Sequence, residues 1–158
     1  MILLDANLLV YAWNQEAPQH ERASIWLQER LNERTGVGIP WSTLLAFVRL
    51  VSNRRIFERA IPIAEAWRLV EEWLDLPNVW IPEPAQRHRE ILRTLIPETG
   101  RAEVVPDAHL AALAIEYGLV LQTTDRDFAR FSGLQWENPI QTLPAAAAPD
   151  RPSGDHHG

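Results

Sequence analysis

The chain of 158 residues is 46% hydrophobic and 23% charged, which is the length and composition of one globular domain rather than of a disordered polypeptide. It contains neither cysteine nor lysine, since all 15 basic residues are arginine, and this excludes disulfide frameworks, cysteine zinc sites, thiol nucleophiles, Walker A loops and Schiff-base chemistry. The formal net charge of −6 argues against a protein that binds nucleic acid through its overall charge alone, whereas carboxylates that bind divalent cations form a locally positive site.

Short apolar runs alternate with stretches of helical periodicity throughout residues 1–143. Residues 2–4 predict a buried strand, and Asp5 follows it as the N-cap of a helix. Apolar spacing predicts a second helix over residues 20–34, and Ser42 or Thr43 is expected to cap a third that runs to Asn53. Two more helices are expected over residues 62–74 and 85–96.

The last predicted helix has a signal at each end. Pro106 suits its first turn, and Gly118 can adopt the left-handed conformation that ends a helix after Tyr117. The remaining strands are expected over residues 37–39, 79–81, 119–123 and 134–136. Because parallel strands need crossover connections, this alternation predicts an α/β fold, a three-layer α/β/α sandwich with a central parallel sheet. Residues 144–158 are rich in Pro and Ala and predict a disordered C-terminal tail.

The N-terminal apolar run is unlike a signal peptide, because it lacks a basic leader and is interrupted by Asp5 and Asn7. No run of about 18 apolar residues, the length that spans a bilayer, occurs in the chain. We therefore expect a cytoplasmic protein without a membrane span.

Three aspartates are predicted to meet at one edge of the sheet. Asp5 comes directly after the first predicted strand, and Asp125 follows residues 119–124, which hold a later one. Asp107 lies in the first turn of the helix that precedes this later strand. Ligands of open parallel sheets bind beyond the carboxyl ends of the strands. One such acid alone is more often a helix cap, but three like charges repel one another unless they bind a cation. Ligands that are all oxygen select hard ions, so we expect Mg²⁺ or Mn²⁺.

Three segments of the chain resemble PIN-domain ribonucleases, and more narrowly the VapC toxins of bacterial toxin–antitoxin pairs. They are ILLDANLL, VPDAHLAALA and TTDRDF, at residues 2–9, 105–114 and 123–128, and WENP at 136–139 is similar to the end of one VapC branch. The resemblance covers residues 1–143 and implies a PIN-like nuclease domain. It also implies a Mg²⁺-dependent endoribonuclease, with Asp5, Asp107 and Asp125 as its acids and Asp127 close to them.

One position departs from the pattern of the family. PIN domains usually carry a further glutamate on the helix after the second strand, and that position is Ala46 here. Glu103, four residues before Asp107, is a candidate substitute, although a solvated loop acid is the more common reading of such a residue. The departure leaves open whether the site holds one metal ion or two, and whether catalysis is weakened.

The hypothesis assigns Asp5 and Asp107 to anchoring the metal ion, and Asp125 to completing its shell directly or through water. Asp127 would orient these groups from outside, and Asn7 and Thr124 are candidates for supporting hydrogen bonds. The ion would activate a water and stabilise charge on the phosphoryl group, and the resemblance implies a 5′-phosphate product. His109 is expected to point away from the acids, because it lies two positions after Asp107 on a helix.

Arginines provide the predicted contact with RNA. The densest basic stretch consists of Arg49, Arg54, Arg55 and Arg59, of which the first three are the RNA-binding candidates. A planar guanidinium pairs well with phosphate. A solvated basic face that pairs with nearby acids explains the same stretch equally well. The resemblance further implies a cognate antitoxin that blocks the cleft, and a homodimer.

Three other functions remain alternatives at this point. The first is a PIN-like protein that has lost catalysis and acts as the binding partner of an antitoxin, which Ala46 suggests. The second is another aspartate-based phosphotransfer enzyme, which is disfavoured because such enzymes also use a lysine, and because Asn7 stands where a phosphatase needs a second acid. The third is a DNA nuclease, since the acids do not distinguish ribose from deoxyribose.

Overall fold

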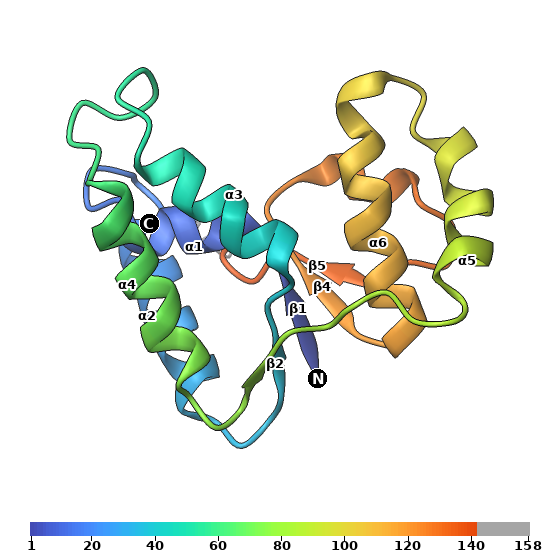
Figure 1. Ribbon diagram of the computed structural model, residues 1–158, viewed down its shortest axis with the longest axis horizontal. Helices are drawn as coiled ribbons and strands as arrows, with labels where there is room; N and C mark the ends of the chain where they lie inside the picture. The colour runs from blue at the N-terminus through green and yellow to red at the C-terminus, as the bar shows by residue number, and fades with distance from the viewer. Residues whose placement is uncertain (142–158) are drawn as a thin grey trace, which may run out of the picture.

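A five-stranded parallel sheet forms the centre of the computed structural model, which describes residues 1–141 (Figure 1). The predicted tail over residues 144–158 lies outside the described residues. The strand order is β3-β2-β1-β4-β5, and every neighbouring pair is parallel. The strands are β1 (Ile2–Leu4), β2 (Val37–Gly38), β3 (Val79–Trp80), β4 (Val120–Gln122) and β5 (Trp136–Glu137).

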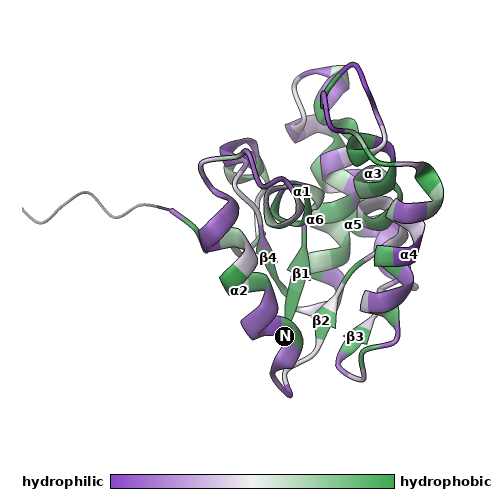
Figure 2. Cartoon of the chain, turned by 90° about the vertical axis from the view of Figure 1, so that its left-hand side faces the viewer, coloured by the Kyte–Doolittle hydropathy of each residue, from purple (hydrophilic) through white to green (hydrophobic). Residues whose placement is uncertain are grey.

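Helices cover both faces of the sheet, so the predicted three-layer α/β/α architecture is confirmed. One core joins Leu3 and Leu121 of the sheet to α5 (His88–Leu95) and α6 (Val105–Tyr117). The other joins Leu4 to α1 (Ala6–Trp13), α2 (His20–Asn32), α3 (Trp41–Val51) and α4 (Ile63–Leu74). Successive side chains of a strand point to opposite faces, which is why Leu3 and Leu4 enter different cores. Figure 2 shows a hydrophobic strand β1 at the centre of the fold, and mixed hydrophobic and hydrophilic residues along α4.

Most predicted elements are present, but several boundaries differ. Helix α5 begins three residues later than expected, and a 3₁₀ turn (Ile96–Glu98) follows it. Further 3₁₀ turns lie before α6 (Ala102–Val104) and after β4 (Arg126–Arg130). The last strand is shifted toward the C-terminus, to residues 136–137.

The predicted cap of α3 was wrong. The helix begins at Trp41 after Pro40, without a side-chain cap, so Ser42 and Thr43 lie inside its first turn. The hydroxyl of Thr43 instead donates to the carbonyl oxygen of Leu4 at 2.8 Å, which ties α3 to the end of β1. This hydroxyl serves tertiary packing rather than the helix terminus.

Two of the predicted helix ends agree with the sequence. Asp5 is the N-cap of α1, and its carboxylate accepts a hydrogen bond from the backbone N–H of Ala6 at 2.7 Å. Gly118 ends α6 with φ of 64°, the left-handed conformation that favours glycine. Within residues 1–141, no helix combines the length and the apolar composition that crossing a bilayer requires.

Candidate active site

The carboxyl ends of β1 and β4 meet at one edge of the sheet. Leu4 pairs with Gln122, and the N–H of Asp5 donates to the carbonyl oxygen of Gln122 at 3.0 Å. The residues that follow the two strands, Asp5 on one side and Thr123 on the other, are therefore neighbours. Parallel pairing thus brings together the chain segments of Asp5 and Asp125, although the neighbours Asp5 and Thr123 lie 118 positions apart in the sequence.

The hydroxyl of Thr123 is the central hydrogen-bonding group of this edge, and the side chain is fully buried. It donates to Oδ2 of Asp5 at 2.7 Å and accepts from Nδ2 of Asn7 at 3.2 Å and from the N–H of Asp125 at 3.0 Å. Thr124, the residue expected from the sequence, contributes its backbone N–H, which donates to Oδ1 of Asn7 at 3.4 Å. Sequence reasoning missed Thr123, because only the strand register shows that it lies opposite Asp5.

Asp5 is held in place on both carboxylate oxygens. Thr123 donates to one oxygen and the N–H of Ala6 donates to the other, so the side chain has a fixed orientation. Burial raises the pKa of Asp5 above its ordinary value, the two hydrogen bonds oppose that rise, and the charge of Asp125 adds to it. The fold therefore holds the Asp5 carboxylate where partial loss of solvent disfavours its ionised form.

Asp107 has a different environment in the first turn of α6. Its side chain is partly buried and makes no hydrogen bond or ion pair with any other residue among 1–141. Burial, followed by the charges of Asp5, Asp125 and Asp127, raises the pKa of Asp107 to about 6, against the opposing charge of Arg130. The predicted acids therefore act on one another electrostatically at this edge of the sheet.

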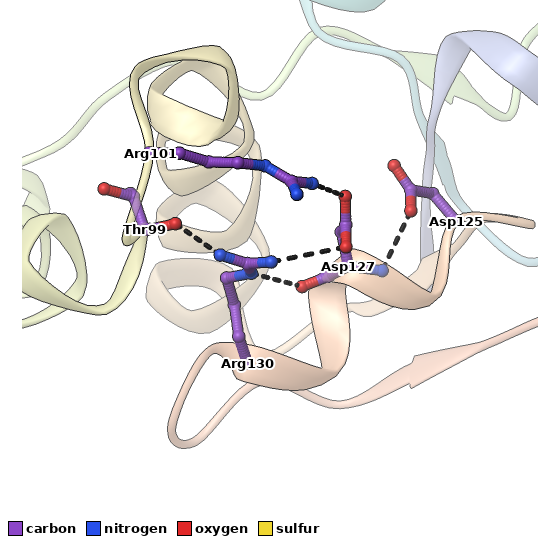
Figure 3. Close-up of polar contacts among 5 residues, drawn as sticks. All are labelled: Thr99, Arg101, Asp125, Asp127 and Arg130. Atoms are coloured by element: carbon purple, nitrogen blue, oxygen red, sulfur yellow. Dashed lines mark hydrogen bonds and ion pairs between the residues drawn. The ribbon is translucent and has the colours of Figure 1, made fainter.

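Asp125 and Asp127 belong to the turn that follows β4. Oδ1 of Asp125 accepts from the N–H of Asp127 at 2.8 Å and caps the 3₁₀ turn. Asp127 pairs with two arginines, at 2.5 Å from Nη2 of Arg101 and at 3.3 Å from Nη2 of Arg130 (Figure 3). Asp127 is therefore neutralised by cations, whereas Asp107 has no such partner.

The four acids are close enough to repel one another, but they are not arranged as a finished metal site. Within residues 1–141, no group of three His, Asp or Glu side chains stands ready to hold one ion. The hydrogen bonds explain this, because Asp5 points at Thr123 and Asp127 points at its two arginines. A cation would draw these side chains from their present partners.

Neither Ala46, at the usual glutamate position, nor the candidate substitute Glu103 adds a carboxylate to this group of acids. Ala46 lies on α3 one turn after Thr43, the residue tied to the end of β1, so the helix passes this edge of the sheet without a carboxylate. Glu103 is exposed and is not among the charges that act on Asp107.

The predicted RNA-binding arginines lie away from the acids. They line a hollow of about 540 Å³ at the end of α3, together with Leu45, Val48 and Ile63, and they are Arg49, Arg54 and Arg55. The distance from Thr43 to the end of α3 at Val51 is about 12 Å, at 1.5 Å per residue. These arginines therefore form a basic surface separate from the acids, which suits a long ligand that contacts both.

His109 points away from the acids, as expected. Its Nδ1 lies 3.0 Å from Nε2 of the buried His88, whose Nδ1 lies 3.2 Å from a carboxylate oxygen of Glu116. Burial and the neighbouring His88 lower the pKa of His109. This chain of contacts joins α5 to α6 and is structural.

Comparison with known proteins agrees with this geometry. A sequence model of the PIN domain matches residues 2–134. The chain belongs to the PIN-domain family. Within that family it is similar to ribonuclease VapC33 of Mycobacterium tuberculosis, with 38% identity over 142 residues that cover 89% of this chain and 99% of the relative. It is 39% identical to ribonuclease VapC37 of the same organism, over 90% of this chain and all of that relative. The chain is therefore a member of the VapC group of PIN domains.

Solved structures show the same fold at lower identity. A chain of FitAB bound to the IR36 DNA fragment has a TM-score of 0.62 and 17% identity, and the match covers 92% of this chain and 100% of that one. A chain of VapBC2 from Rickettsia felis, bound to a promoter DNA fragment, has a TM-score of 0.61 and 21% identity over 87% and 98% of the two chains. At such identity these likenesses establish the PIN fold alone.

Proposed function

We propose that this protein is a divalent-metal-dependent endoribonuclease, the toxin of a toxin–antitoxin pair, that hydrolyses RNA phosphodiester bonds in the cytoplasm. The observation that carries the proposal is the meeting of Asp5, Asp107 and Asp125 at the carboxyl edge of the sheet, with Asp107 left without a partner. The VapC relatives are named ribonucleases, which supports RNA as the substrate.

The donor chemistry of the site fits Mg²⁺ or Mn²⁺. All candidate ligands are carboxylate oxygens, which hard cations prefer, and the raised pKa of Asp107 reflects negative charge that a cation relieves. Asp5, Asp107 and Asp125 would hold the ion. Such an ion supplies a water that is nucleophilic near neutral pH and positive charge for the phosphoryl oxygens.

The residues around the acids provide their orientation. The hydroxyl of Thr123 makes hydrogen bonds with Asp5, with Asn7 and with the backbone N–H of Asp125. It therefore fixes Asp5 relative to the turn that carries Asp125. Asp127 holds Asp125 through its backbone N–H and is itself held by arginines. Hydrogen-bonding partners of this kind set ligand geometry in metal sites.

We further propose that a cognate antitoxin binds this chain and that two copies form a homodimer. The structural neighbours come from FitAB and VapBC complexes, which supports a protein partner. Leu45 and Ile63 are 56% and 68% exposed in the hollow that the arginines line, and such apolar exposure is typical of an interaction surface.

The test is cleavage of single-stranded and structured RNA by purified protein free of any bound inhibitor, with Mg²⁺, Mn²⁺ or EDTA. We expect cleavage that requires metal and that is lost in the Asp5→Asn, Asp107→Asn double variant. Asp75→Asn is the matched control, because Asp75 is an exposed acid that ends α4 at the opposite edge of the sheet. Loss of activity in this control, or cleavage that survives EDTA, would contradict the proposal.

A DNA oligonucleotide of the same sequence distinguishes the remaining nuclease alternative. Equal cleavage of DNA and RNA would contradict ribonuclease specificity. Metal binding that depends on Asp5 and Asp107, with no cleavage of any nucleic acid, would instead favour a catalytically weakened partner of an antitoxin, in line with Ala46.

A further inference from the structure

Arg101 reaches the edge of the acid cluster from the segment before α6. It is an extended residue just before the 3₁₀ turn at Ala102–Val104, and its side chain crosses to Oδ2 of Asp127 at 2.5 Å (Figure 3). Asp127 is also bound by Arg130, so two guanidinium groups share one carboxylate. This small cluster carries one positive charge in excess beside the negative charges of Asp5, Asp107 and Asp125.

The two arginines differ in how firmly they are held. Arg130 is 27% exposed and donates to the carbonyl oxygen of Thr99, to the carbonyl oxygen of Asp127 and to its carboxylate. It therefore joins the turn after β4 to the loop before α6. Arg101 is 56% exposed, and its contact with Asp127 is the one interaction that its side chain makes within residues 1–141.

The ion pair of Arg101 can be exchanged at little cost. An exposed ion pair contributes about 0–1 kcal/mol, and Asp127 keeps its bonds to Arg130 when Arg101 leaves. A guanidinium has five N–H donors in a planar fork, which suits two oxygens of one phosphate. Four of these donors on Arg101 have no partner among residues 1–141.

An RNA phosphate that approaches this edge meets three carboxylates, so a cationic side chain beside them would add to the positive charge that a bound metal ion supplies. The three arginines at the end of α3 line a separate hollow, and none of the acids is among its lining residues. Arg101 is an exposed cation that is paired with Asp127, and the charge of Asp127 acts on Asp107.

We propose that Arg101 binds a phosphate of the RNA beside the bond that is cleaved, while Arg130 keeps Asp127 and the turn after β4 in place. This inference rests on the proposed ribonuclease function and assigns a substrate-binding residue to it. Arg101 exchanges the carboxylate of Asp127 for the phosphate when RNA binds.

The test measures binding of a fluorescently labelled single-stranded RNA by anisotropy, in an Asp107→Asn protein that does not cleave. Adding Arg101→Gln is expected to weaken binding about 10-fold, which corresponds to about 1.4 kcal/mol. It should also reduce the slope of log affinity against log salt by about 0.7, the value for one phosphate contact on a single strand. Arg101→Lys keeps the charge and should keep the slope while losing part of the affinity.

Two controls separate phosphate binding from a structural role. Arg34→Gln removes the same charge from an exposed loop at the opposite edge of the sheet, before β2, and should leave affinity within about twofold. Asp127→Asn breaks the same ion pair from its other side. If Arg101 binds phosphate, Asp127→Asn preserves the salt slope, whereas a merely structural pair predicts the same loss for both variants.

The outcomes also separate this inference from the proposed function. If Arg101→Gln binds RNA as Arg34→Gln does, with an unchanged slope, the inference is overturned while ribonuclease activity stands. If the wild-type protein cleaves no RNA and the Asp107→Asn protein binds none, the proposed function fails and the inference fails with it.

Discussion

The Asp107→Asn substitution is expected to stabilise the metal-free protein at neutral pH while it abolishes RNA cleavage. Asp107 has a pKa of about 6 in the folded protein against an ordinary value of 3.8, so its ionised form is disfavoured there. At about 1.36 kcal/mol per pKa unit, this difference corresponds to about 3 kcal/mol. Because the side chain is only partly buried, solvent screening reduces the expected gain to about 1–2 kcal/mol.

The sign of the pH dependence follows from the direction of the shift. A carboxyl whose pKa is raised on folding binds its proton more tightly in the folded protein, so the folded state is penalised wherever the group is ionised. The penalty is fully present above pH of about 6 and disappears as the pH falls toward about 4. The asparagine variant carries no such charge, so its advantage should be largest at pH of about 7.5 and vanish near pH of about 4.

Thermal unfolding in EDTA across this pH range measures the effect. For a domain of this length, a gain of about 1–2 kcal/mol raises Tm by about 3–6 °C. Asp75→Asn, which removes an exposed acid at the end of α4, should shift the free energy of unfolding by less than about 0.5 kcal/mol. An asparagine variant no more stable than wild type at pH of about 7.5, or an advantage that persists at pH of about 4, would refute the reasoning.

Three further predictions concern the same edge of the sheet and its surroundings. Mg²⁺ at ten times its Kd should stabilise the wild-type protein by about 1.4 kcal/mol, measured as a rise in Tm, and should leave the Asp5→Asn, Asp107→Asn double variant unchanged. Thr123→Val should lower the free energy of unfolding by about 1–3 kcal/mol in denaturant titrations, because the partly buried Asp5 loses one of its two donors. Thr123→Ser, which keeps the hydroxyl, should lose less. Charge reversal of the three arginines that line the hollow beside α3 should weaken RNA binding in the anisotropy assay without changing Mg²⁺ affinity, and unchanged RNA binding would show that this hollow serves another ligand.

The acids could be predicted from the sequence because their positions follow from strand ends. An apolar run that stops at Asp5, a second that leads to Asp125, and a helix that begins near Asp107 must present those residues at one edge of a parallel sheet. This conclusion needs the order of the elements but not the register of the strands. It therefore survives errors of a few residues in the predicted boundaries.

Thr123 and Arg101 could not be predicted, because their roles depend on register and on the path of a loop. Leu4 pairs with Gln122, and a slip of one residue would place Thr124 rather than Thr123 opposite Asp5. Arg101 lies in a segment without apolar periodicity, so nothing in the sequence indicates that its side chain crosses to Asp127. The prediction of the α3 cap was wrong for a related reason, because the hydroxyl of Thr43 donates to the carbonyl oxygen of Leu4 rather than to the helix end.

The hydrogen bonds also explain why Asp107 is the acid that most resists ionisation. Asp5 accepts from Thr123 and Ala6, Asp125 accepts from the N–H of Asp127, and Asp127 pairs with two arginines. Each of these carboxylates has a donor that offsets part of its charge, and Asp107 has none among residues 1–141. A cation bound beside Asp107 would stabilise its ionised form, which the folded chain disfavours. It would also offset the repulsion from Asp5, Asp125 and Asp127. Stability and the proposed chemistry therefore make opposite demands on Asp107. The Asp107→Asn substitution stabilises the metal-free fold but removes a carboxylate that the proposed metal ion needs.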